Sequence, residues 1–265
     1  MTMSRSPRNL AAAITLSALT VAAVHAASAG EKLVGTYGEV RTILSFKVSD
    51  AAAEKLLPDG WQVSPVSTGP SKDANLNVIF IDELAVQNPD GTPGELYRIA
   101  GIGVPAKKKG TDATVGMVGP GLVSNPSYAP GAYGTAAVAS ATVDRHVHID
   151  TAGKSTAEES WEFKGDGGDT IQLQLQYISG VPVRSKTEAT PHSAVRPDFY
   201  RIYRFEQAAD VVRSTATGTD RVLKYPFKAT GAKLSSLFDG SEQLISITSV
   251  PFFSRQIFLP AEVTQ

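Results

Sequence analysis

The sequence predicts a mainly β protein, built as a barrel or cone of antiparallel strands with a few short helices. Several segments alternate apolar and polar residues with the period of a strand. The chain has 23 glycines and 16 prolines, and such turn residues separate short strands in all-β proteins. One strand also has a wholly polar face, which suits a barrel around a wet cavity better than a dry sandwich.

Eight segments are expected as strands, and the clearest is Thr170–Ile178. Its apolar side chains at 171, 173, 175 and 177 alternate with glutamines at 172, 174 and 176, so one face is dry and the other wet. The others are rich in β-branched or apolar residues: 41–48, 75–82, 97–104, 136–143, 199–205, 244–250 and 255–260.

Helices are expected to be few and short. The segment 50–57 is one, because Ser49 or Asp50 can cap it and Pro58 stops it. The segments 206–212 and 233–238 are each expected to form two helical turns. Residues 110–134 are rich in glycine and proline, which is typical of a lid or a binding loop.

The first 29 residues resemble a secretory signal peptide. Arg5 and Arg8 precede an uncharged stretch over 10–24, which ends in the small-residue cleavage sequence 27–29. A membrane anchor needs about 20 apolar residues, so we favour a cleaved signal. We therefore expect one β-rich domain over 30–265, located in the periplasm or secreted, with no membrane attachment after cleavage.

The composition excludes several classes of protein. The formal net charge is -1, so the chain lacks the basic field that holds a nucleic-acid backbone. It has no cysteine, which removes thiol nucleophiles, disulfides and cysteine-ligated metals. We expect no cofactor, and the sequence leaves homo-oligomerisation open.

A candidate metal site is the pair His146 and His148. Two histidines separated by one residue on a strand project from the same face, as in several zinc and iron sites. A third ligand is needed, and the candidates are His192, Asp150 and Glu159. The alternative is a solvent-facing strand end.

Candidate catalytic residues are the consecutive lysines Lys107, Lys108 and Lys109. A lysine becomes a Schiff-base nucleophile when a dry pocket or a neighbouring cation lowers its pKa. The run lies between Pro105 and Gly110, so we favour a solvated turn.

Two pairs of acidic residues, at 82–83 and 158–159, are further candidates. Paired carboxylates can share acid and base roles. Because the sequence does not give their separation in space, we expect ordinary surface charge at both.

Three stretches resemble the acetoacetate decarboxylase family. Residues 43–61 resemble that family's opening strand, its short helix and the proline–glycine segment that ends this helix, and 77–83 resemble its next strand. Residues 231–239, 244–250 and 252–260 resemble its closing pattern. The resemblance covers about 37–260 and implies a β cone or barrel with an internal pocket.

The family's decarboxylases use a Schiff-base lysine, and this chain departs from that pattern. The best match to the lysine segment is Gly131–Val138, which puts Ala137 at the lysine position. An alanine cannot form an imine. The resemblance therefore implies a pocket lined by Arg41, Tyr133 and Ala137, without the family's nucleophile.

The function we expect is binding of a small carboxylate, oxo-acid or apolar ligand in an internal cavity. One alternative is an active lyase, of decarboxylase or aldolase/dehydratase type, that uses a displaced lysine among Lys107, Lys108 and Lys109. Another is a metal-dependent periplasmic enzyme using His146 and His148. A third is a structural or interaction module.

Overall fold

A computed structural model describes residues 30–262 of the chain. The predicted signal peptide lies outside these residues. The elements are β1 (Lys32–Lys47), α1 (Asp50–Glu54), β2 (Trp61–Val63), β3 (Leu76–Gln87), β4 (Arg98–Lys108), β5 (Thr114–Val123), the 3-10 helix η1 (Pro126–Tyr128), β6 (Ala136–Ile149), β7 (Ser155–Gly165), β8 (Thr170–Ile178), β9 (Val183–Ala189), β10 (His192–Ser193), β11 (Ile202–Ser214), β12 (Thr219–Asp220), β13 (Val222–Lys224), β14 (Phe227–Thr230) and β15 (Gln243–Leu259).

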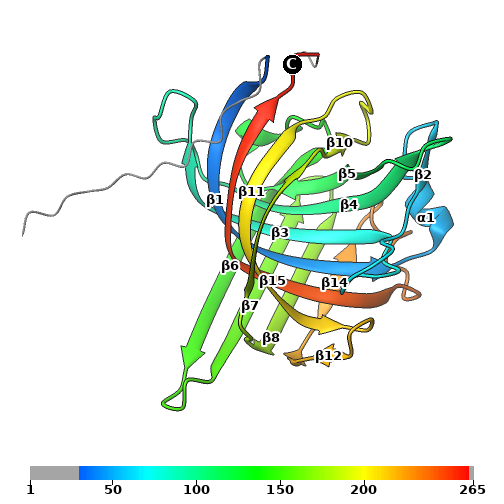
Figure 1. Cartoon of the computed structure of the whole chain (residues 1–265). Coiled ribbons are helices and arrows are strands. Elements are labelled where there is room, and N and C mark those ends of the chain that lie inside the picture. The colour runs from blue at the N-terminus through cyan, green and yellow to red at the C-terminus, as the bar shows by residue number, and fades with distance from the viewer. Residues whose placement is uncertain (1–29, 263–265) are drawn as a thin grey trace, which may run out of the picture.

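The mainly β prediction is confirmed, but the sheet is an open cone rather than a closed barrel. The strands follow the order β12-β11-β15-β1-β3-β4-β5-β6-β7-β8-β13, and Figure 1 shows the strong curvature of this sheet. Most neighbours are antiparallel, whereas β5 pairs in parallel with both β6 and β10. The expected all-antiparallel arrangement is therefore wrong at β5, where the chain crosses over instead of making a hairpin.

The main hydrophobic core lies inside the curved sheet, between the part formed by β1, β3, β4 and β5 and the part formed by β6, β7 and β8. A row of directly paired residues shows the core-facing side of the first part: Thr42, Phe80, Ala100 and Leu122 on β1, β3, β4 and β5. Against these strands pack Trp161 and Phe163 from β7 and the apolar side of β8. The glutamines of β8 point the other way, as their alternation predicts.

The opposite face of the same strands carries a second, smaller cluster. Arg41, Ile81 and Ile99 are paired in the adjacent row, so their side chains point away from the main core. A register shift between Gly38 and Glu39 lies just beyond this row. Here Tyr37, Val86, Tyr97, Val123 and Ile257 pack together beneath Tyr128 and Ala129. The segment 124–135 thus covers a site at this end of the sheet.

Each expected strand overlaps an observed one, and the last two merge into β15. The expected helix at 50–57 is confirmed as the shorter α1. The helix expected over 206–212 is wrong, because this segment is the centre of β11, paired on both sides. The helix expected over 233–238 is also wrong, because these residues form turns. The loop expected over 110–134 contains β5, so the covering segment begins only at 124.

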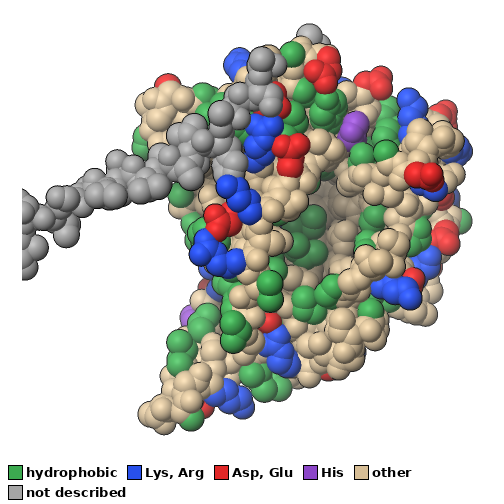
Figure 2. All heavy atoms as spheres, in the orientation of Figure 1, with side chains coloured by type: hydrophobic (Ala, Val, Ile, Leu, Met, Phe, Trp, Pro, Cys, Tyr) green, Lys and Arg blue, Asp and Glu red, His purple; other side chains and the backbone are tan. Residues whose placement is uncertain are grey.

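Figure 2 shows one face of the molecule with a central hollow that has apolar side chains at its bottom. Among the residues that the structure describes, no helix is long and apolar enough to cross a membrane.

Candidate functional site

Four buried charged side chains meet on the face that the 124–135 segment covers. Glu39 and Arg41 lie on β1, Glu83 on β3 and Arg255 on β15, and we call them the arginine–glutamate cluster. Each exposes at most 9% of its surface. The strand register brings them together, because Glu39 is paired directly with Glu83 and Arg255 with Tyr37.

The contacts within the cluster are unequal. Glu39 is held by both arginines: its Oε1 lies 2.6 Å from Arg255 Nε, and its Oε2 lies 2.5 Å from Arg41 Nη2. Glu83 has one longer contact, 3.3 Å between its Oε1 and Arg255 Nη2. Its Oε2 is buried and accepts no hydrogen bond. Glu83 is therefore the less stabilised of the two carboxylates.

This inequality sets the protonation states. Burial, together with the charge of Glu39, raises the pKa of Glu83 to about 8. Burial alone would raise the pKa of Glu39 as well, but Arg255 and Arg41 hold it below its usual value. Near neutral pH the cluster thus contains two guanidinium groups, one carboxylate and one carboxylic acid. Its net charge is positive, which suits a bound anion.

Aromatic rings surround the cluster. The Arg41 guanidinium lies 3.5 Å from the ring centroid of Phe253, and that of Arg255 lies between Tyr37 and Tyr203, at 5.1 and 4.7 Å. Tyr97 is buried beside it, and burial raises its pKa, so it is a neutral phenol. The rings exclude water and thereby strengthen electrostatic interactions at the site.

Two further side chains extend the site towards the covering segment. Tyr133 donates a hydrogen bond of 2.7 Å to the hydroxyl of Tyr203. The charge of Arg201 acts on Tyr37 and Tyr133, and its Nε is buried without an acceptor. A buried N–H donor without a partner is costly, and an anion in the cluster would supply an acceptor near it.

A second buried carboxylate, that of Glu159 on β7, lies against the opposite face of β1, and both of its oxygens accept hydrogen bonds. Its Oε2 accepts from Thr42 Oγ1 at 2.5 Å and from Trp161 Nε1 at 2.9 Å. Its Oε1 accepts from the hydroxyl of Tyr177 at 3.1 Å, and Ser249 lies 2.7 Å from that hydroxyl. We call this set the Glu159 network, and it joins β1, β7, β8 and β15 through the main core.

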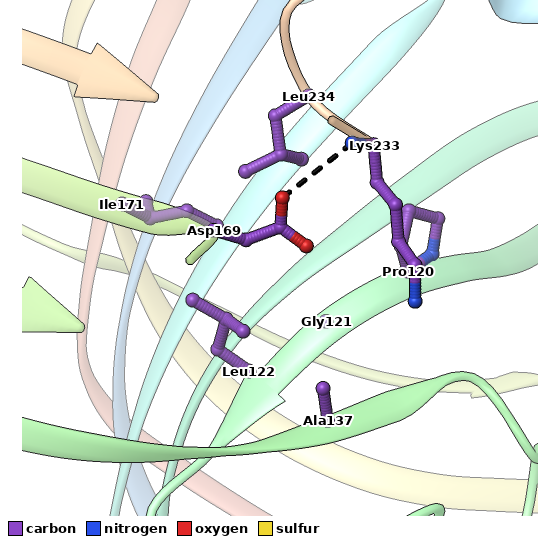
Figure 3. A pocket seen from close by; sticks show the side chains of 8 residues that line it. All are labelled: Pro120, Gly121, Leu122, Ala137, Asp169, Ile171, Lys233 and Leu234. Atoms are coloured by element: carbon purple, nitrogen blue, oxygen red, sulfur yellow. Dashed lines mark hydrogen bonds between the residues drawn. The ribbon is translucent and has the colours of Figure 1, made fainter. Parts of the chain in front are cut away.

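The structure brings together some of the residues that the resemblance implied. Arg41 belongs to the cluster, and Tyr133 reaches its border through Tyr203. Ala137 lies elsewhere, in a crevice of about 10 Å³ that Asp169 and Lys233 also line. Figure 3 shows Lys233 running alongside Pro120, with its backbone nitrogen 3.4 Å from Asp169 Oδ1. The crevice has room for about one water molecule.

The consecutive lysines lie far from the cluster. Lys107 is half-buried and 3.7 Å from Asp112, and Lys108 and Lys109 are exposed. They end β4, nine residues beyond Arg98, which is about 30 Å along a strand. None of the lysines in the described range 30–262 is buried.

The two histidines are exposed on the outer face of β6. His146 is paired with Glu158 on β7, and both line an open groove of about 280 Å³. Across residues 30–262, no three histidine or acidic side chains are grouped to hold a metal.

Sequence reasoning missed Glu39 and Arg255, and it treated Glu83 as surface charge. That expectation is wrong for Asp82 and Glu83, which are 8% and 0% exposed, and for Glu159, which is 7% exposed. A signal was present in the alternation of β15, where Phe253, Arg255 and Ile257 share one face. A charge in a row of apolar residues indicates a buried polar site.

No family model and no curated protein matches the chain. Solved structures do match over most of it. An acetoacetate decarboxylase-like enzyme from Sphingomonas wittichii RW1 is 10% identical, with a TM-score of 0.55, over 87% of this chain and 92% of that one.

The enduracididine biosynthesis enzyme MppR, complexed with pyruvate, is 11% identical with a TM-score of 0.51, over 85% of this chain and 88% of that one. The HEPES-bound form of MppR is 12% identical, with a TM-score of 0.52, over 86% of this chain and 85% of that one. The fold that the sequence motifs implied is thereby confirmed: this chain has the acetoacetate decarboxylase-like fold.

Proposed function

We propose that this protein binds a small carboxylate or oxo-acid at the arginine–glutamate cluster, without forming an imine. The observation that carries the proposal is the imbalance of contacts in the cluster: two buried guanidinium groups hold Glu39, whereas Glu83 has one contact of 3.3 Å and a buried oxygen without a hydrogen-bond donor. Buried charges without full compensation are costly, and they are retained where a ligand uses them.

The chemistry of the site suits a carboxylate. A guanidinium group binds a carboxylate through two parallel hydrogen bonds, which are short and strong where water is excluded. Arg41 and Arg255 supply the charge, and Arg201 supplies an additional donor. The phenol groups of Tyr97 and Tyr203 would contact the remainder of a small ligand.

The fold neighbours are consistent with this ligand class, because MppR has been solved in complex with pyruvate. The absence of a buried lysine from the described residues supports binding without a Schiff base. Borohydride treatment in the presence of pyruvate should therefore leave the mass of this protein unchanged. A reduced adduct on any lysine would instead support an active lyase.

Calorimetric titration with pyruvate at pH 6.5 tests the proposal. Arg41→Ala should weaken binding at least tenfold, because it removes one guanidinium group from a water-excluded site. The matched control is Arg184→Ala, whose partner Glu206 lies on the surface. If Arg41→Ala does not fold, as judged by circular dichroism, Arg41→Lys tests the same loss of bidentate geometry.

Unchanged affinity in a folded Arg41 variant would overturn the proposal. Equal affinity for pyruvate and for neutral acetone would instead favour an apolar ligand.

We also propose that the protein is exported and processed after Ala29. The proposal rests on the basic start, the apolar stretch and the small-residue end of the first 29 residues. N-terminal sequencing of the protein recovered from its native host should begin at Gly30. Recovery of cytoplasmic protein that retains residues 1–29 would contradict export.

A further inference from the structure

The two glutamates of the cluster form a pair with only one well-compensated member. Their residues face each other directly across β1 and β3. Glu39 contacts two guanidinium groups, whereas Glu83 contacts one, and Glu83 Oε2 has no hydrogen-bond donor. A proton held between the two carboxyl groups would give Glu83 a bond to Glu39 and would remove the repulsion between them.

We infer that binding of an anion in the arginine–glutamate cluster is coupled to uptake of one proton by the Glu39–Glu83 pair. The inference rests on the proposed function and adds its regulation by pH. With both glutamates ionised, their two charges balance those of Arg41 and Arg255. A monoanion would then bring a third negative charge into a buried site, and one proton on Glu83 restores the balance.

Other groups around Glu83 do not take up this proton. They are Tyr37 and Arg41 on β1, Tyr97 just before β4, Tyr128 on η1, and Arg255 on β15. Burial raises the pKa of Tyr37, Tyr97 and Tyr128, so these phenols already hold their protons. The arginines keep their charge throughout the relevant range.

The position of the titration follows from the pKa of Glu83, which burial and Glu39 raise to about 8. Below this pH the proton is already present, and an anion binds without further uptake. Above it, each bound anion should take up close to one proton. The affinity should then fall by as much as about tenfold per pH unit, the limit for one coupled proton.

The test is a pH-stat titration of the purified protein with pyruvate at pH 8.5 and at pH 6.5. At pH 8.5 the acid needed to hold the pH should approach about three-quarters of an equivalent per bound pyruvate, because about a quarter of Glu83 already holds its proton, and at pH 6.5 it should approach zero. Glu83→Gln should bind pyruvate at both pH values with equal affinity and no proton uptake. The control Glu158→Gln changes an exposed glutamate on the outer face of β7 and should behave as the wild type.

Three outcomes would overturn the inference, and they separate it from the proposed function. Pyruvate binding at pH 8.5 without proton uptake would leave the site intact and remove the coupling. Proton uptake that persists in Glu83→Gln would assign the proton to another group. An absence of pyruvate binding at both pH values, in wild type and variant alike, would contradict the proposed function and, with it, the coupling.

Discussion

Two buried carboxylates, Glu83 on β3 and Glu159 on β7, lie against opposite faces of β1 and differ in their hydrogen-bond partners. Glu159 accepts three hydrogen bonds from neutral donors, and within residues 30–262 it forms no salt bridge, although Arg145 is its cross-strand neighbour on β6. Glu83 has one long contact with an arginine and faces a second glutamate. A carboxylate that is fully hydrogen-bonded acts as part of the scaffold. A carboxylate with too few hydrogen-bond donors can still bind a ligand or a proton.

The largest expected effect comes from the Glu159 network. Glu159→Ala should destabilise the protein by about 4 kcal/mol, because three buried donors lose their acceptor at once. Chemical denaturation measures this loss. The matched control Glu158→Ala, on the outer face of the same strand, should change the stability by less than about 0.5 kcal/mol. A small effect of Glu159→Ala would remove the distinction between the two faces.

Glu83→Gln should change stability in the opposite direction, by an amount that grows as the pH rises from 4.5 to about 8. A raised pKa means that the folded state binds the proton more tightly than the unfolded state. The resulting stabilisation is full below pH 4.5, the ordinary value, and is lost as the pH rises through about 8.

The variant avoids this loss and should be more stable than the wild type at pH 9 by about 2 kcal/mol or more, since the loss accumulates at up to about 1.4 kcal/mol per pH unit between pH 4.5 and about 8. Near pH 4.5 the two should be similar. Denaturation curves at both pH values check this, and a wild type that keeps its full stability at pH 9 would contradict it.

A smaller effect is expected at the border of the cluster. Tyr133→Phe removes the hydrogen bond to Tyr203 and should cost about 1 kcal/mol, as for a single neutral bond. Thermal unfolding measures the change, and Tyr203→Phe should give a similar loss. A double variant that loses no more than either single one would show that the hydroxyl groups act as a pair.

The smallest effect is expected from the lysines at the end of β4. Lys107→Ala should change stability by less than about 0.5 kcal/mol, because its contact with the exposed Asp112 is long and solvated. Pyruvate affinity should be unaltered. A large loss of pyruvate affinity would show that Lys107 contributes to the ligand site, and it would favour the alternative of a lyase that uses a displaced lysine.

Much of the fold could be predicted from the sequence, because alternation along strands such as β8 depends on burial alone. The segment 206–212 escaped prediction because its alanines and acidic residues favour a helix, whereas pairing with β9 and β15 makes it a strand. Of the candidate site, the sequence analysis named Arg41 and Tyr133, and it named Glu83 only as surface charge. Glu39 and Arg255 were not named, since the cluster meets only through the register of β1, β3 and β15.

A crystal structure of the protein soaked with pyruvate at pH 6.5 would show directly where the ligand binds. We expect a pyruvate carboxylate within hydrogen-bonding distance, about 3 Å, of the guanidinium groups of both Arg41 and Arg255, and no covalent bond to any lysine. Pyruvate bound at the Ala137 crevice, or linked to a lysine, would contradict binding at the arginine–glutamate cluster.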